Sequence, residues 1–322
     1  MMQRLIFMGS DPIALPMMES IRSGRCGEVE VAAVYTQPDR RRGRGKKVVA
    51  NEIKLWAESC GIPVFQPERM SKSVRLEISD MGVDAILVMA YGHILSQALI
   101  DTPSKGIWNL HTSILPKYRG ASPIQCAVAS GDAQTGVSLM RVIREMDAGP
   151  ILDVETVDIL RLDTALDVEA KLSRACVPLV ERNLGRVLAG EAEPTVQSEA
   201  AATYVRKLGK EDGGLDFSRS AKSLAHRING LFAWPSSRFI HGEFAIKVGL
   251  ADYSEDSRNG REGQVFGLED MGLAIGCGSG VLYLRQLQRP GGKMLEAEAF
   301  LRGYDLAEGT VLESHPMTVL VS

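Results

Sequence analysis

The first half of the chain alternates short apolar runs with longer segments of helical spacing. Apolar runs predict strands at residues 5–8, 29–35, 63–65 and 84–89. Helices are predicted to start at Pro12 with Asp11 as cap, and to span 51–60 with Asn51 as cap and 71–81. Residues 84–89 are almost wholly apolar, which is typical of a strand buried on both faces. This order predicts a doubly wound, Rossmann-like α/β domain that binds ligands at the carboxyl ends of its strands.

The second half has a different pattern. A helix predicted over about 164–188 closes the first domain, and the polar stretch 190–201 has no periodicity, as is typical of a linker. A helix over 220–229 is followed by five short apolar runs with glycine-containing turns, at 238–240, 244–250, 264–267, 273–277 and 281–287. This pattern predicts a small β-barrel of the OB type. The expected division is a catalytic domain at 1–189, a linker at 190–206 and an OB-like domain at 207–322.

Composition agrees with a two-domain globular enzyme. The 322 residues are 45% hydrophobic and 24% charged, and the net charge of −3 does not mark the chain as a nucleic-acid binder. The five cysteines are scattered without a C-x-x-C pair, which argues against a disulfide framework and a zinc site. No signal peptide or apolar run of transmembrane length is recognisable. We therefore expect a reduced cytoplasmic protein that does not bind membranes.

The first predicted strand ends in Gly9-Ser10-Asp11-Pro12. This is not the G-x-G-x-x-G fingerprint of dinucleotide-binding folds, and Pro12 has no backbone N–H to offer a pyrophosphate. A nicotinamide cofactor is therefore not expected.

Candidate chemistry lies in residues 107–152. Asn109 and His111 are two positions apart on a predicted strand, so their side chains should project from the same face while Trp108 and Leu110 face a core. Pro116 and Gly120 follow soon afterwards and end the strand. An amide and an imidazole side by side at a strand end can bind and protonate the oxygen of a carbonyl under nucleophilic attack.

Several separated blocks occur in this region in a fixed order: NLHTSILP from Asn109 to Pro116, Arg119-Gly120, Pro123-Ile124, Gly131-Asp132, Thr135-Gly136 and Met146-Asp147-Ala148-Gly149. They resemble the formyltransferase family that uses 10-formyltetrahydrofolate, as does Trp234-Pro235 further along. The resemblance implies transfer of a formyl group from that folate to the α-amino group of methionine carried by initiator tRNA. It also implies a catalytic trio of Asn109 and His111 with Asp147, which orients His111 and favours its protonated form.

The resemblance further implies a folate pocket and a tRNA site. The folate would be bound as a co-substrate, with no metal, by Ala90, Tyr91, Gly92, Ser113, Ile114, Leu115 and Pro116. The tRNA would be bound by the basic loop RRRGRGKK, that is, by Arg40, Arg41, Arg42, Arg44, Lys46 and Lys47. Cationic side chains on such a loop can track phosphates. The chain is expected to act as a monomer.

The second domain is less informative about RNA. Residues 207–322 carry 13 Lys/Arg and 15 Asp/Glu, a net charge of 13 − 15 = −2, so RNA contact would need a local basic face. Candidates for that face are Lys207, Lys210, Arg227, Arg238 and Lys247. A domain that only braces the catalytic domain is an equal alternative.

Three other functions fit parts of the pattern. A sugar-nucleotide N-formyltransferase would share the trio and the folate, but the basic loop and the barrel domain argue against it. A non-catalytic RNA-binding protein would not need the intact trio. A formyl-folate hydrolase would release formate without any acceptor.

Overall fold

The computed structural model describes residues 2–42, 47–256 and 258–322. The chain folds into two compact units, each built from several segments. The first comprises Met1–Arg119, Gly136–Val157 and Ala170–Ala202, and the second Gly120–Thr135, Asp158–Glu169 and Thr203–Ser322.

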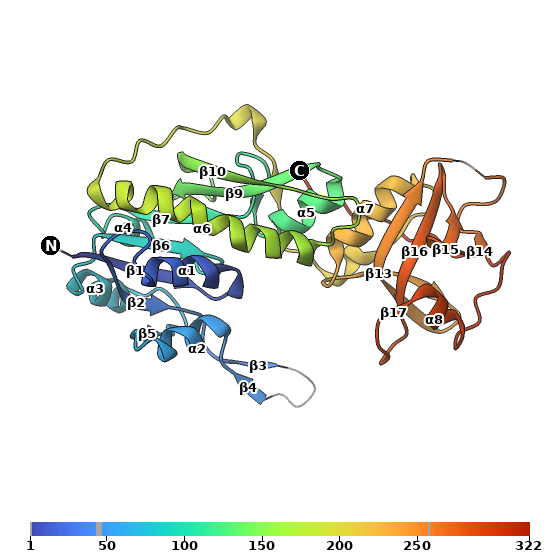
Figure 1. Cartoon of the computed structure of the whole chain (residues 1–322), viewed down its shortest axis with the longest axis horizontal. Helices are drawn as coiled ribbons and strands as arrows, with labels where there is room; N and C mark the ends of the chain where they lie inside the picture. Colours follow the sequence, from blue (N-terminus) through green and yellow to red (C-terminus); the bar gives the residue numbers. More distant parts are fainter. Residues whose placement is uncertain (1, 43–46, 257) are drawn as a thin grey trace. The chain divides into compact units, whose positions relative to one another are not determined.

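A seven-stranded sheet forms the centre of the first unit (Figure 1). Its order is β10-β9-β7-β6-β1-β2-β5. The bounds are β1 (Gln3–Gly9), β2 (Val29–Tyr35), β5 (Val64–Phe65), β6 (Ala85–Met89), β7 (Ile107–His111), β9 (Gln134–Arg141) and β10 (Ile151–Asp158). Strands β2, β1, β6 and β7 run parallel, but β9 pairs antiparallel with β7. The doubly wound α/β fold is thus confirmed with one correction: the sheet is mixed, and the apolar pattern did not reveal β9 and β10.

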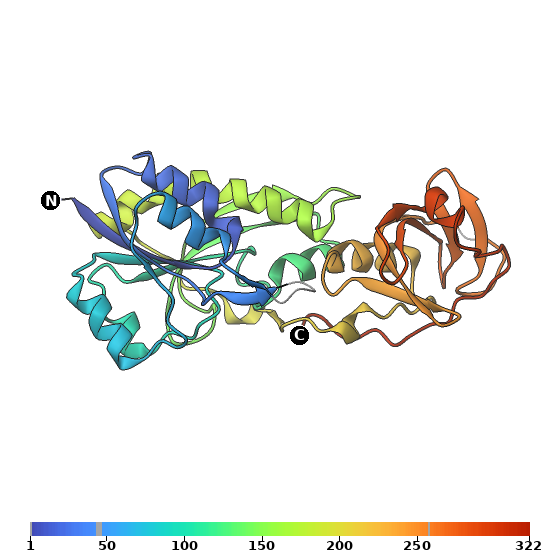
Figure 2. The same cartoon turned by 90° about the horizontal axis from the view of Figure 1, so that it is seen from below.

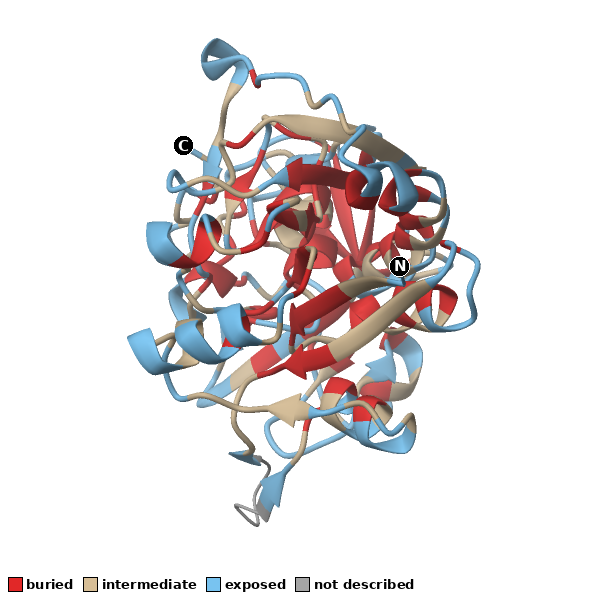
Figure 3. Cartoon of the chain, turned by 90° about the vertical axis from the view of Figure 1, so that its left-hand side faces the viewer, coloured by how far each residue is buried: buried red, intermediate tan, exposed pale blue. Residues whose placement is uncertain are grey.

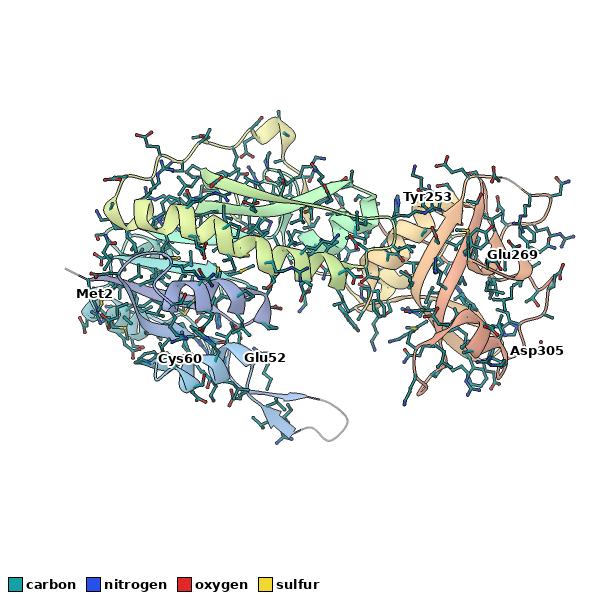
Figure 4. The ribbon with its side chains drawn as sticks, in the orientation of Figure 1. Met2, Glu52, Cys60, Tyr253, Glu269 and Asp305 are labelled. Atoms are coloured by element: carbon teal, nitrogen blue, oxygen red, sulfur yellow. The ribbon has the colours of Figure 1, made fainter. Side chains whose placement is uncertain are left out.

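Helices of this unit begin after the two predicted caps, Asp11 and Asn51, and also at positions where no cap was predicted. They are η1 (Pro12–Ala14), α1 (Leu15–Arg22), α2 (Glu52–Ser59), α3 (Lys72–Asp80), α4 (Gln97–Ile100) and α6 (Ala165–Ala189). The Asn51 side chain accepts a hydrogen bond from the Lys54 amide, and that of Ser71 accepts one from the Val74 amide. Such bonds satisfy amides that have no partner within the helix. Figure 4 labels Glu52 and Cys60 at the two ends of α2.

Helices cover both faces of this sheet. In Figure 2, α1 and α6 lie on one side of the strands and α3 on the other. Ile78 of α3 and Leu99 of α4 join the apolar cluster on one face, whereas Val180 and Leu184 of α6 line the interior of the opposite face with Leu5. The strands are accordingly largely coloured as buried in Figure 3. This burial explains why their sequences are nearly continuous apolar runs.

Gly9 ends β1 at the carboxyl edge of the sheet. A Cβ at this position would lie 2.5 Å from the Met89 carbonyl oxygen of the neighbouring β6. Any side chain would therefore push these strand ends apart, where the fold places its ligand site.

The polar segment after α6, expected to be a linker, makes specific contacts within the first unit. Thr195 forms a β-bridge with Ile151 at the start of β10, and η2 (Glu199–Ala201) is a short helical turn. Gln197 is buried. Residues 190–202 thus pack against the catalytic unit rather than hanging free.

The second unit combines helices with an antiparallel sheet. Its helices are α5 (Pro123–Ser130), η3 (Lys210–Gly213), α7 (Ala221–Leu231) and α8 (Ala297–Leu301). The sheet order is β12-β13-β16-β15-β14, with β17 beside β16. The bounds are β12 (Ser237–His241), β13 (Phe244–Ser254), β14 (Val265–Glu269), β15 (Gly272–Gly276), β16 (Val281–Gln288) and β17 (Leu295–Glu296). The predicted antiparallel β domain is confirmed, with a sixth strand, β17, that the apolar pattern did not reveal.

One apolar cluster holds this unit together. Leu224 and Ile228 of α7 pack with Ile246 of β13 and Leu284 of β16, all fully buried. Tyr253, labelled in Figure 4, packs against the same cluster from the end of β13, and its ring contacts the guanidinium of Arg161 at 4.5 Å. Among the described residues, no helix is both long and apolar enough to cross a membrane.

Candidate active site

Strand β7 presents Asn109 and His111 on one face. Ile107, two positions before Asn109, faces the same side of the sheet and belongs to the apolar cluster on the α3 side. Trp108 faces the other side and lines the interior against α6. Asn109 is paired in register with Val88 of β6, and His111 with Ser138 of β9. The predicted alternation along this strand is confirmed. The two polar side chains leave the sheet together at its carboxyl edge.

His111 has a protein oxygen beside each of its ring nitrogens. Its Nε2 lies 2.9 Å from the Tyr118 carbonyl oxygen, and its Nδ1 lies 3.7 Å from Oδ2 of Asp147. The ring is only 6% exposed. The first distance is that of a hydrogen bond, whereas the second is too long for one and places the carboxylate beside the ring as a neighbouring charge. The structure therefore brings His111 and Asp147 together in an orientation suited to an ion pair.

Asp147 owes its position to an unusual turn between β9 and β10. Its own φ is +51°, a left-handed conformation that non-glycine residues adopt infrequently. Two residues later, a Cβ on Gly149 would lie 1.8 Å from the Arg141 carbonyl oxygen. Only glycine permits this close approach, which folds the turn back on the end of β9 and places the Asp147 carboxylate at His111.

The predicted folate wall at residues 90–92 follows β6. Ala90 and Gly92 are exposed and have φ values of +48° and +78°. Tyr91 points inward instead: it is 2% exposed, and its hydroxyl donates to Met70 Sδ. The Tyr91 carbonyl accepts a hydrogen bond from Gln37 Nε2 at 3.0 Å. Ala90 and Gly92 are thus the accessible residues of this wall, and Tyr91 supports them from behind.

The second predicted wall, Ser113 to Pro116, is pinned to β9. Ser138 Oγ donates to the Ser113 carbonyl at 2.7 Å and accepts from the Leu115 amide at 3.1 Å. The Ser113 hydroxyl donates to the Lys117 carbonyl at 2.6 Å, so it serves the turn itself. Ile114 and Pro116 are half-buried and Leu115 is buried. Ser138, which no sequence motif singled out, fixes the shape of this wall.

Two short strands flank the centre of the basic loop and pair with each other, and we call this pair the hairpin. β3 (Arg40–Arg42) and β4 (Lys47–Val49) form an antiparallel ladder in which Arg40 pairs with Val49, a regular element where only a loop was expected. Arg40 and Arg41 are exposed. Arg44 and Lys46 lie outside the described residues, as do the side chains of Arg42 and Lys47.

Polar contacts anchor the base of this hairpin close to the folate wall. The carboxylate of Asp39 accepts from Lys54 and from Gln66, each at 2.8 Å, and the hydrogen bond from Lys54 holds the Asp39 pKa below its usual range. Gln37 accepts a hydrogen bond from Arg40 at 3.0 Å while it donates to the Tyr91 carbonyl. One side chain thus joins the hairpin to the wall at residues 90–92.

In the second unit, Arg227 is not available to RNA. Its side chain is 6% exposed, and Nη2 donates to the Asp212 carbonyl at 2.9 Å and to Thr318 Oγ1 at 3.3 Å. Burial lowers the pKa of the guanidinium. The prediction that Arg227 could contribute to a basic face was wrong, because its side chain is buried beneath α7 and donates to Asp212 and Thr318.

Comparisons with known proteins agree with this architecture. Residues 3–180 match the formyl transferase family, and residues 207–305 match the formyl transferase C-terminal domain. A methionyl-tRNA formyltransferase from Gluconobacter oxydans is 37% identical over 96% of this chain and 99% of its own length. One from Moorella thermoacetica is 35% identical over 96% and 99%.

Solved structures with the same fold are more distant. The sugar 3N-formyltransferase WlaRD superposes with a TM-score of 0.67 at 16% identity, covering 90% of this chain and 98% of its own. HypX from Aquifex aeolicus, in complex with tetrahydrofolic acid, gives 0.61 at 17%, covering 94% of this chain and 47% of its own. At these identities the likeness shows the fold alone. The family matches and the relatives that align over nearly the whole sequence show more. The chain belongs to the formyl transferase family and, within it, to the methionyl-tRNA formyltransferases.

Proposed function

We propose that this protein transfers the formyl group of 10-formyltetrahydrofolate to the α-amino group of methionine esterified to initiator tRNA. The observation that carries the proposal is that Asp147 Oδ2 lies 3.7 Å from His111 Nδ1, and that Asn109 lies on the same face of the strand as His111. An acyl-transfer site needs such groups where negative charge develops. The full-length likeness to methionyl-tRNA formyltransferases supports the choice of acceptor.

In the proposed reaction, the neutral amine attacks the formyl carbon and forms the new C–N bond. The carbonyl oxygen becomes an oxyanion, and the amide of Asn109 donates a hydrogen bond to it. The bond to N10 of the folate then breaks, N10 gains a proton and the amine loses one. Asp147 accepts the amine's proton, directly or through a water molecule, and that proton then passes to N10, so the proton lost by the amine is the one gained by the leaving group.

His111 stabilises the oxyanion by the charge of its protonated ring. Both of its nitrogens face protein acceptors, the Tyr118 carbonyl and the Asp147 carboxylate. A direct proton transfer from the ring to N10 would therefore require one of these acceptors to be exchanged for the substrate.

The proposed substrate surfaces extend from this trio. The folate would lie against Ala90, Tyr91, Gly92, Ser113, Ile114, Leu115 and Pro116. The tRNA would be bound by Arg40, Arg41, Arg42, Arg44, Lys46 and Lys47, of which Arg44 and Lys46 lie outside the described residues. The ties from Gln37 to Arg40 and to the Tyr91 carbonyl support a common location for the two surfaces.

The expected domain division also remains a proposal, with a catalytic domain at 1–189, a linker at 190–206 and an OB-like domain at 207–322. The family matches at 3–180 and 207–305 support it, because they flank the proposed linker. We further propose that the protein acts as a monomer.

Tracing the formyl label tests the function. The protein is supplied with labelled 10-formyltetrahydrofolate and either methionyl initiator tRNA, an amino-sugar nucleotide or buffer alone. We expect label in the tRNA fraction, as acid-stable formylmethionine after deacylation. Label in the amino sugar would instead establish the alternative, a sugar-nucleotide N-formyltransferase, and formate released without an acceptor would establish a hydrolase.

A further inference from the structure

The turn that carries Asp147 is held by a side chain from the polar segment after α6. Gln197 Nε2 donates to the Asp147 carbonyl at 2.8 Å and to the Gly149 carbonyl at 2.7 Å. The Gln197 side chain is buried, at 7% exposure. One amide therefore satisfies two carbonyls of the left-handed turn, where an unsatisfied buried acceptor would be costly.

Arg119 fixes the orientation of that amide. Gln197 Oε1 accepts from Arg119 Nε at 3.1 Å and from Nη2 at 2.9 Å. A guanidinium only donates and a carbonyl only accepts, so a flipped Gln197 amide would be wrongly paired at both ends. The arginine, 1% exposed, is anchored on its other edge by two hydrogen bonds to Glu199, at 2.7 and 3.0 Å. These bonds hold the pKa of Glu199 below its usual range.

The residue before Arg119, Tyr118, contacts His111, the side chain beside Asp147. The Tyr118 carbonyl contacts His111 Nε2, and the next residue, Arg119, acts through Gln197 on Asp147. The separation of the imidazole and the carboxylate is thus set by two adjacent residues, one on each side.

We propose that Arg119 and Gln197 are positioning residues for formyl transfer, which hold the Asp147 turn at the distance and angle from His111 that the reaction needs. This inference rests on the proposed function for its kinetic consequence only. Neither residue need touch a substrate, so their loss should lower kcat and leave the KM values of both substrates unchanged. A misplacement of about 1 Å at a reacting group can lower a rate by roughly 100-fold.

Gln197→Glu separates positioning from folding. The carboxylate has nearly the volume of the amide and keeps a partner for Arg119, so the buried guanidinium stays paired. It cannot donate to the Asp147 and Gly149 carbonyls, however, and it places negative charge against them. Arg182→Met is the matched control, because Arg182 also ties the first unit together, through ion pairs with Asp153 and Glu155 of β10 at 2.6 and 2.5 Å.

The first readout is the imidazole signal of His111 in NMR spectra of the full-length protein, which has five histidines to assign. Asp147→Asn provides the reference, since it removes the carboxylate beside the ring. We expect Gln197→Glu to shift the His111 ring resonances in the same direction as Asp147→Asn, and Arg182→Met to leave them in place.

The second readout is steady-state kinetics with the folate donor and the charged tRNA. We expect kcat to fall about 10- to 100-fold in Gln197→Glu at unchanged KM, with Arg182→Met close to the wild type. Unchanged His111 resonances in Gln197→Glu would overturn the inference, as would a rise in KM without a fall in kcat. Failure of the wild-type protein to formylate tRNA would instead overturn the proposed function, and the NMR comparison would still decide whether Gln197 positions Asp147.

Discussion

At the scale of single residues, Asn109 and His111 occupy alternate positions of one strand and are expected to act on the same developing charge. Removing one donor from an oxyanion site typically slows a reaction by about 10²- to 10³-fold. We therefore expect Asn109→Ala and His111→Ala each to lower kcat by at least about 100-fold in the label-transfer assay. Near-normal turnover in either variant would contradict its assigned role.

The stability of these two variants should differ. Asn109 is half-buried, whereas His111 is almost fully buried and bonded to the Tyr118 carbonyl. The midpoint temperature of thermal unfolding should therefore fall little in Asn109→Ala and further in His111→Ala. His241→Ala is a useful control, because His241 also hydrogen-bonds, to Tyr304 at 2.9 Å, but lies in the second unit.

At the scale of elements, the hairpin of β3 and β4 offers a test of tRNA binding. Arg40 and Arg41 are exposed, and Asp39, at the hairpin's base, is paired with Lys54. We expect Arg40→Gln with Arg41→Gln to raise the KM for tRNA and leave the KM for the folate unchanged. The log–log slope of tRNA affinity against salt should become shallower by roughly 0.7 for each phosphate that the variant no longer neutralises.

The control for the hairpin is a pair of exposed arginines elsewhere in the first unit. Arg22 pairs with Glu19 on α1, and Arg25 with Glu181. Changing both to Gln removes the same net charge as the hairpin variant. An equal loss of tRNA affinity in the two double variants would show that overall charge, and not the hairpin, governs binding.

A second element, η3 in the second unit, depends on the buried carboxylate of Asp212. This carboxylate accepts hydrogen bonds from Arg206 at 2.6 and 2.9 Å, from the Gly209 amide at 2.7 Å and from the Thr318 hydroxyl. The Arg206 guanidinium is the main reason that the pKa of Asp212 lies well below its usual range. Asp212→Asn should lower the free energy of unfolding by about 1–3 kcal/mol at neutral pH, measured by urea denaturation.

The pH dependence of that loss follows from the direction of the shift. A carboxyl whose pKa is depressed in the folded protein stabilises it above the unfolded pKa, near 4, and loses this contribution as the pH falls through the folded value. The difference in unfolding free energy between wild type and Asp212→Asn should thus be constant above about pH 5 and shrink at lower pH. A difference that grows on acidification would contradict this account.

Local elements were the most predictable part of the structure. Asn51 caps its helix as expected, and Ser71 and Ser220, the first residues of two predicted helices, also prove to be caps, because a cap depends on a hydroxyl or amide and the next three residues. The antiparallel entry of β9 beside β7 was not predictable, since strand order depends on residues distant in sequence. Gln197 was missed for the same reason: nothing in a polar, aperiodic segment indicates that one amide will return to the Asp147 turn.

At the scale of the whole molecule, the two units have separate apolar cores. Leu284 lies fully buried in the cluster of the second unit, and Ile86 in one of the clusters of the first. All residues proposed to bind folate lie in the first unit. A ligand stabilises only the structure whose unfolding destroys its site, by about 2.7 kcal/mol at a hundred times its Kd. A folate analogue should therefore protect the first unit alone.

Hydrogen exchange on the full-length protein can measure this difference in each unit. With a bound folate analogue we expect slower amide exchange in β1, β6 and β7 and unchanged exchange in β13 to β16. Leu284→Ala should instead speed amide exchange in β13 to β16 and leave β1, β6 and β7 unchanged, since a cavity in the second core costs about 2–5 kcal/mol there. Exchange that changes equally in both units, for either perturbation, would mean that they unfold as one cooperative body, and the separate assignment of folate binding to the first unit would lose its thermodynamic basis.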